Sequence, residues 1–113
     1  ETGSNDGLRG LDVDSLRANI QALIDRARRQ APPPRIVIVG MEAPPNYGAD
    51  YAQRFRAVYP DLAQANGAAL VPFLLEGVAG IDSLNQGDGI HPTAAAERLL
   101  ADNVWRVLEP MLR

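Results

Sequence analysis

Ile36-Val37-Ile38-Val39 lies near the middle of the chain and consists entirely of β-branched residues. Such side chains favour extended backbone, and this run does not alternate between apolar and polar residues. The absence of alternation is typical of a strand that is buried on both faces, as in a parallel sheet covered by helices. Ala69-Leu70-Val71 is a second, weaker run of the same kind. The sequence therefore predicts two neighbouring strands of a parallel sheet.

An amphipathic helix is predicted before the first strand, because apolar residues recur there at positions i, i+4, i+7, i+8 and i+11. These residues are Leu16, Ile20, Leu23, Ile24 and Ala27. Asp12 or Asp14 can cap the start of this helix, and Ser15 is a further capping candidate. The prolines that begin at Pro32 end it.

Two more helices are predicted after the first strand. One runs from about Tyr51 to Gln64, and Pro60 is expected to kink it or to break it at Tyr59. The other starts near Pro92 and continues to the C-terminus. Its inward-facing residues are expected to be Leu100, Val104, Val107, Leu108 and Met111.

The element order is thus helix, strand, helix, strand, helix, which indicates an α/β layered fold with right-handed crossovers. Two strands alone are too narrow a sheet for three helices to cover. Glu1-Thr2-Gly3 has the character of the carboxyl end of a further strand. We therefore expect residues 1–113 to form the C-terminal portion of a single larger α/β domain, completed by another polypeptide or by a cut part of the same one.

Composition excludes several classes of function. The chain has 113 residues, a formal net charge of −3 and no cysteine. Disulfides, thiolate metal sites and a cysteine nucleophile are therefore excluded. The balanced charge gives no nucleic-acid surface, and no apolar run is long enough for stable membrane insertion.

The segment Gly87-Asp88-Gly89-Ile90-His91-Pro92 contains the only histidine of the chain. An aspartate three residues before a histidine can accept the imidazole Nδ1–H and fix the tautomer that a general base needs. The alternative is an aspartate that caps a turn and a histidine that packs before a helix. A metal site is disfavoured, because His91 has no second histidine, cysteine or i+4 ligand beside it.

Two other segments should lie at the carboxyl edge of the sheet, where sites form in open parallel sheets. In the segment 3–7, the amide of Asn5 could donate a hydrogen bond to a developing oxyanion, although an ordinary turn would explain the same residues. In the segment 44–48, Tyr47 could line an apolar slot. The alternative there is a plain connection in which Asn46 caps the next helix.

No serine has the strand–turn–helix setting of a nucleophile. Ser4 lies in the expected turn beside Asn5, Ser15 at a helix start, and Ser83 between Asp82 and Leu84 without a flanking glycine. The predicted base therefore has no visible nucleophile in this chain.

In their order and spacing, these segments resemble the SGNH hydrolases, also called GDSL esterases/lipases. The similarity is greatest to the bacterial arylesterase/thioesterase I/lysophospholipase branch, of which Asn5-Asp6-Gly7-Leu8-Arg9-Gly10 is especially typical. The resemblance implies a three-layer flavodoxin-like fold with a parallel sheet. It covers essentially the whole chain, but only the C-terminal three-fifths or so of such a domain.

The resemblance also implies roles for individual residues. Asn5 matches an asparagine that donates to the oxyanion hole, His91 the general base, and Asp88 its orienting carboxylate. Gly7 and Leu8 lie in a segment that matches a mobile loop near the acyl pocket. Asn46 and Tyr47 lie in a segment that resembles another wall of the substrate site.

The family's Gly-Asp-Ser nucleophile segment and a second oxyanion glycine are absent from this sequence. The resemblance implies that an N-terminal fragment of the same enzyme carries both, so this chain alone should be inactive. With that partner, the enzyme should hydrolyse small carboxylic esters or thioesters through an acyl-serine intermediate, without metal or organic cofactor. A periplasmic or secreted location is implied too. The alternatives are a carbohydrate O-deacetylase of the same fold and a non-catalytic, degenerate hydrolase module.

Overall fold

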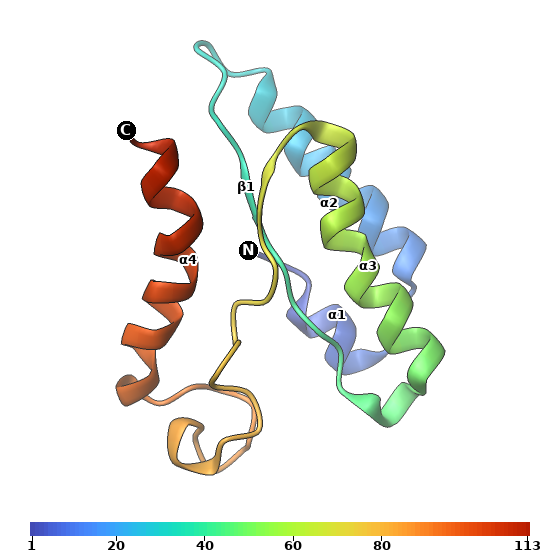
Figure 1. Cartoon of the computed structure of the whole chain (residues 1–113). Helices are drawn as coiled ribbons and strands as arrows, with labels where there is room; N and C mark the ends of the chain where they lie inside the picture. The colour runs from blue at the N-terminus through green and yellow to red at the C-terminus, as the bar shows by residue number, and fades with distance from the viewer. The chain divides into compact units, whose positions relative to one another are not determined.

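A computed structural model describes all residues from Glu1 to Arg113 (Figure 1). The chain divides into two compact units, Glu1–Pro72 and Phe73–Arg113. None of the helices is both long enough and apolar enough to cross a membrane.

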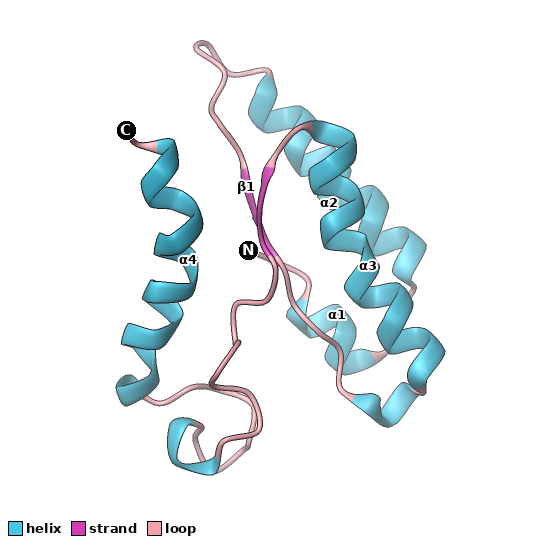
Figure 2. Ribbon diagram, viewed as in Figure 1, coloured by secondary structure: helices cyan, strands magenta, loops and turns pink.

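The first unit contains three α-helices, a short 3₁₀ helix and a pair of strands, and Figure 2 colours the helices and strands differently. The elements are α1 (Ser4–Arg9), α2 (Val13–Arg28), β1 (Val37–Val39), the short 3₁₀ helix η1 (Pro45–Tyr47), α3 (Ala49–Asn66) and β2 (Ala69–Val71). The strands are parallel, with Val37 opposite Ala69 and Val39 opposite Val71. Both predicted strands and their parallel pairing are thereby confirmed.

Helices α2 and α3 lie side by side and cover the same face of the strand pair (Figure 1). The apolar faces of both helices meet β1 in one core. Its buried residues include Leu16, Ile20, Ile24, Ile38, Val39, Phe55, Val58, Tyr59 and Leu62. The buried residues of α2 and α3 recur every three to four positions, which places them on one face of each helix.

Asp12, one of the three predicted candidates, caps α2. Its Oδ2 accepts hydrogen bonds from the Ser15 backbone N–H at 3.0 Å and from the Ser15 hydroxyl at 2.8 Å. Both bonds favour the ionised form, so the pKa of Asp12 lies below its usual range, with the hydroxyl bond as the largest cause. Ser15 thus supports the cap as a donor and is not itself the N-cap residue.

The expected break at Pro60 is wrong, because α3 runs without interruption from Ala49 to Asn66. Pro60 lacks the N–H that would bond the Arg56 carbonyl, but both residues are exposed, so water can reach this side of the helix. On the opposite side of the helix, Phe55 and Leu62 are both buried in the core. Burial on that side is sufficient to keep the two halves of the helix in line.

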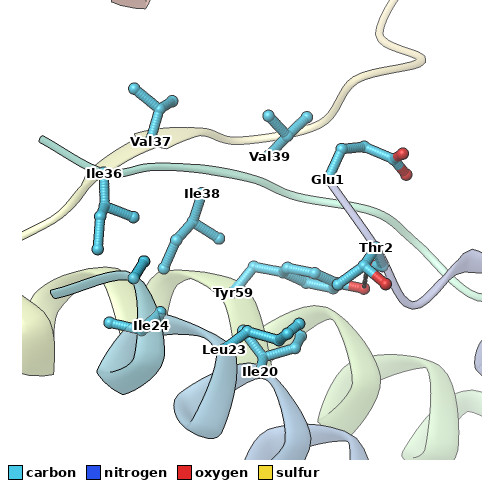
Figure 3. A pocket seen from close by; sticks show the side chains of 11 residues that line it. Glu1, Thr2, Ile20, Leu23, Ile24, Ile36, Val37, Ile38, Val39 and Tyr59 are labelled. Atoms are coloured by element: carbon cyan, nitrogen blue, oxygen red, sulfur yellow. Dashed lines mark hydrogen bonds between the residues drawn. The ribbon is translucent and has the colours of Figure 1, made fainter. Parts of the chain in front are cut away.

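An open apolar hollow of about 160 Å³ lies between β1 and α2 (Figure 3). Leu23 lines it and remains 58% exposed, although its helical position predicted an inward-facing side chain. Glu1 and Thr2 lie at one end of the hollow, beside Val39. The expectation that Glu1–Gly3 are the end of a strand is not met, since these residues form no strand and the sheet contains only β1 and β2.

The second unit consists of a long loop and one helix. The loop includes the 3₁₀ turns η2 (Asp82–Leu84) and η3 (Ala94–Ala96), and the helix is α4 (Glu97–Met111). The last predicted helix is therefore present, but its first turn is 3₁₀ and its α-helical part begins at Glu97.

The face of α4 that was expected to point inward is only half-buried, and Asn103 is the buried residue of this helix. The Asn103 side-chain amide donates to the carbonyls of Leu74 and Glu76, both at 2.9 Å. These two bonds satisfy a buried polar group and fasten the loop to α4. Polar contacts thus contribute to holding this unit together.

Candidate active site

Asp88 and His91 form a hydrogen-bonded pair, as the sequence predicts. The distance from His91 Nδ1 to Asp88 Oδ2 is 2.6 Å. A carboxylate can only accept, so Nδ1 carries the proton and the other ring nitrogen, Nε2, is an acceptor in the neutral ring. The His91 side chain is 69% exposed and Nε2 makes no hydrogen bond within the chain. This is the geometry that a general base requires.

Backbone bonds within the same turn hold the carboxylate in place. Asp88 Oδ1 accepts from the N–H groups of Ile90 at 2.9 Å and His91 at 3.1 Å. One oxygen therefore fixes the turn, while the other orients the imidazole. Gly89 has a φ of 69°, in the left-handed region that glycine adopts without steric cost.

The turn is closed at its base by residues that sequence analysis did not single out. The Gln86 N–H donates to the His91 carbonyl at 2.7 Å, and the Gln86 carbonyl accepts from Gly89 at 2.9 Å. The Gln86 side chain also donates to the Pro92 carbonyl at 3.2 Å. The only signal for this role in the sequence is the position of Gln86 directly before the glycine-rich turn.

Asn85 supports the same loop from the other side. Its side-chain amide donates to the carbonyls of Val78 at 2.8 Å and Ile81 at 2.9 Å. Asn85 also forms an isolated antiparallel bridge with Pro92. The Asp88–His91 pair therefore lies on a loop whose two ends are joined.

The hydrogen bond from His91 is the main reason that the pKa of Asp88 falls to about 2, and the two backbone N–H groups lower it further. A lowered pKa means that the carboxylate stays charged in moderately acidic solution. The stabilising contact is fully present above pH 3.8, the ordinary value, and is lost as the pH falls through about 2.

We expect the Asp88 carboxyl group to remain almost fully ionised at pH 3.5, where an unperturbed aspartate with a pKa of about 3.9 is more than half protonated. Carboxyl ¹³C shifts measured between pH 3 and 7 check this, with Asp88→Asn to assign the signal and circular dichroism to confirm folding. His91→Ala should raise the titration midpoint. A midpoint near 4 in the parent protein would show that the pair is not formed.

Asn5 lies in α1, and the expected turn at residues 3–7 is instead this short helix. The helix forms because the Gly3 carbonyl accepts from the Gly7 N–H at 3.2 Å, and Gly10 ends it in a left-handed conformation. The Asn5 side chain is exposed and has no hydrogen-bond partner in the chain. Its amide N–H groups are therefore available to a ligand.

Gly7 and Leu8 follow Asn5 in the same helix, but they face different surroundings. Gly7 is buried, and a Cβ there would lie 2.9 Å from the Phe55 ring. Gly7 therefore lets α1 approach α3 closely, while Leu8 is half-buried. A substrate contact at either residue stays a prediction.

Asn46 and Tyr47 lie in η1, directly before α3. Asn46 does not cap α3, because Gly48 occupies the N-cap position and no side chain caps the helix. Tyr47 is 46% exposed, and a Cβ at Gly10 would lie 2.6 Å from its ring. Tyr47 therefore lies beside the C-terminal end of α1, and its predicted contact with substrate stays a prediction.

The structure thus brings the predicted residues together in two groups. Asp88 and His91 form a bonded pair in the second unit, while Asn5, Gly7, Leu8, Asn46 and Tyr47 belong to the first. Two of the three serine hydroxyls are engaged within the first unit, where that of Ser4 bonds Glu1 and that of Ser15 bonds Asp12.

Comparison with known proteins connects these two groups to one enzyme family. Residues 1–99 match the GDSL-like Lipase/Acylhydrolase family. The chain belongs to this family. The match confirms the resemblance that the sequence motifs indicated.

Individual GDSL relatives are similar over nearly the whole chain. Esterase TesA of Pseudomonas aeruginosa is 43% identical over 99% of this chain and 55% of its own length. Thioesterase 1/protease 1/lysophospholipase L1 of Escherichia coli is 32% identical over 99% of this chain and 53% of its own length. This chain therefore spans about half the length of the curated relatives that it matches.

A solved structure of a GDSL relative confirms the fold class. The crystal structure of TesA superimposes with a TM-score of 0.89 at 44% identity, over 97% of this chain and 60% of that one. The predicted α/β fold with a parallel sheet is therefore that of SGNH hydrolases, and this chain matches a part of it.

Proposed function

We propose that this chain supplies the general base, its orienting carboxylate and one oxyanion donor to a serine ester hydrolase. The observation that carries the proposal is the 2.6 Å bond between His91 Nδ1 and Asp88, which leaves Nε2 without a partner. In a GDSL family member, an exposed base of this kind suits the activation of a hydroxyl nucleophile.

In the proposed reaction, His91 Nε2 takes the proton of a serine hydroxyl while the serine oxygen attacks the ester carbonyl carbon. Asp88 stabilises the imidazolium that results. The amide of Asn5 donates to the oxyanion of the tetrahedral intermediate. His91 then protonates the leaving alcohol or thiol as the carbon–oxygen or carbon–sulfur bond breaks. It next deprotonates a water molecule that releases the acid from the acyl-serine.

The serine of this reaction is proposed to come from a segment outside residues 1–113, in an N-terminal part of the same enzyme. Two observations support this. The hydroxyls of Ser4 and Ser15 are engaged with Glu1 and Asp12, and the GDSL relatives are about twice as long as this chain. The apolar hollow beside β1, with the side chain of Leu23 open to it, offers a place for further chain to pack.

The proposed substrates are small carboxylic esters and acyl thioesters, including aryl esters and lysophospholipids. The names of the relatives, an esterase and a thioesterase/lysophospholipase, support this range. Family resemblance also leads us to propose a periplasmic or secreted location.

Labelling the full-length enzyme with a fluorophosphonate tests the proposal, because such probes react with activated serines. We expect one covalent adduct by intact mass, together with hydrolysis of p-nitrophenyl esters. Absence of both would indicate a non-catalytic module. A preference for acetylated sugars over medium-chain acyl esters would instead indicate a carbohydrate O-deacetylase.

A further inference from the structure

Four aromatic residues follow one another at every fourth position along α3 and the turn before it. They are Tyr47, Tyr51, Phe55 and Tyr59. Residues four apart lie on the same face of a helix, so the rings form a row. Neighbouring ring centroids are 5.7, 6.3 and 5.7 Å apart. We call these four residues the aromatic row.

The aromatic row contacts the segment that carries Asn5 along its whole length. At one end, the Tyr59 hydroxyl donates to the Thr2 carbonyl at 2.9 Å. In the middle, the Phe55 ring fills the space where a side chain at Gly7 would lie. At the other end, the Tyr51 hydroxyl contacts two carbonyls, that of Leu11 at 2.7 Å and that of Asp6, within α1, at 3.3 Å. Helix α1, which is too short to be stable alone, is therefore held in place by the aromatic row.

Tyr59 is the member of the row whose hydroxyl bonds the backbone before α1. It is only 1% exposed, so its hydroxyl must have a partner, and the Thr2 carbonyl provides it (Figure 3). Burial raises the pKa of Tyr59 above its usual range, so the hydroxyl stays protonated and remains a donor.

Gly3 connects this bond to Asn5. Its φ is 101°, and a Cβ there would lie 2.4 Å from the Tyr59 hydroxyl oxygen. The Gly3 carbonyl then accepts the first hydrogen bond of α1, from Gly7. The Tyr59–Thr2 bond therefore fixes the backbone directly before the helix whose second residue is Asn5.

We propose that Tyr59 is a positioning residue, which orients Asn5 toward the oxyanion through its hydrogen bond to the Thr2 carbonyl. This inference rests on the proposed function of Asn5 as an oxyanion donor. Oxyanion stabilisation depends on donors held at a fixed distance, so a loosened α1 costs turnover even though Asn5 itself is intact.

Tyr59→Phe in the full-length enzyme tests the inference, since it removes one oxygen and keeps the buried ring. We expect kcat for p-nitrophenyl esters to fall about three- to tenfold, as for the loss of one hydrogen bond, with KM changed less than twofold. The deciding measurement is a double-mutant cycle with Asn5→Ala. In the Asn5→Ala background, Tyr59→Phe should change kcat less than twofold.

Ser15→Ala is the control, because it removes a hydroxyl whose hydrogen bond, to Asp12 at the start of α2, does not involve α1. Its effect on kcat should be the same with and without Asn5→Ala. If Tyr59→Phe does not fold, Gly3→Ala, which forces a methyl group onto the Tyr59 hydroxyl, takes its place in the cycle.

The outcomes separate the two proposals. If the parent enzyme neither hydrolyses esters nor reacts with a fluorophosphonate, the proposed function fails. If the parent and Asn5→Ala behave as expected but Tyr59→Phe keeps the parental kcat, the positioning role alone is overturned. If Tyr59→Phe lowers kcat by the same factor with and without Asn5→Ala, the positioning role is overturned as well. An effect that acts through Asn5 should disappear once the Asn5 side chain has been removed.

Discussion

Replacing His91 with alanine in the full-length enzyme is expected to lower kcat for p-nitrophenyl esters by a factor of about 10³ or more. The chain has no second histidine, and the imidazole is the only group that Asp88 orients. Without it, the serine hydroxyl has no base and the leaving group has no acid. Initial rates at saturating substrate, with folding checked by circular dichroism, give the measurement.

Ile90→Ala is the matched control for this variant. Ile90 lies in the same turn and is 45% exposed, and its contribution to the turn is the backbone N–H, which alanine retains. We expect kcat within about threefold of the parent for this surface change. A His91→Ala enzyme with kcat within tenfold of the parent would remove His91 from the mechanism.

Replacing Asn5 with alanine is expected to lower kcat about 10²–10³-fold, the usual cost of losing one oxyanion donor. The amide is exposed and unpaired within the chain, so its removal leaves no buried polar group without a partner. KM should change little, because the bond to the oxyanion forms only after attack on the carbonyl.

Asn19→Ala is the control for Asn5→Ala. Asn19 is also an exposed helical asparagine of the first unit, and it lies in the middle of α2. The substitution should leave kcat unchanged within about twofold. Equal behaviour of the two variants would exclude Asn5 from oxyanion stabilisation.

The Asp88–His91 pair could be predicted from the sequence because its geometry is local. Asp88 and His91 are three residues apart, and a tight turn with Gly89 at positive φ is enough to bring their side chains together. The buried run 36–39 and the periodic stretch of α2 were equally clear, because a few neighbouring residues determine each pattern. Local patterns of this kind do not depend on the rest of the chain.

Helix α1 could not be predicted, because its stability comes from distant residues. Its sequence, Ser-Asn-Asp-Gly-Leu-Arg, contains several poor helix formers and suggests a turn. Phe55, which packs against Gly7, and Tyr51, which bonds the Asp6 carbonyl, hold it from α3, more than forty positions along the chain. Tertiary contact therefore overrides local propensity at the segment that carries Asn5.

The continuity of α3 through Pro60 was missed for a related reason. A proline usually kinks or breaks a helix when no other contact holds the helix in place. In α3, the aromatic row and Leu62 pack on the buried side and keep the helix continuous. The fourfold spacing of the aromatic residues was visible in the sequence. Their hydrogen bonds to Thr2 and Leu11 were not, since backbone acceptors leave no pattern of residue types.

The loop that carries His91 has a practical consequence for protein engineering. Asp88 and His91 both lie within the short peptide from Asn85 to Pro92, whose two ends pair with each other. Grafted onto another scaffold, this peptide would bring the hydrogen bonds that orient its imidazole, while the new scaffold would have to supply acceptors for the Asn85 amide in place of the Val78 and Ile81 carbonyls.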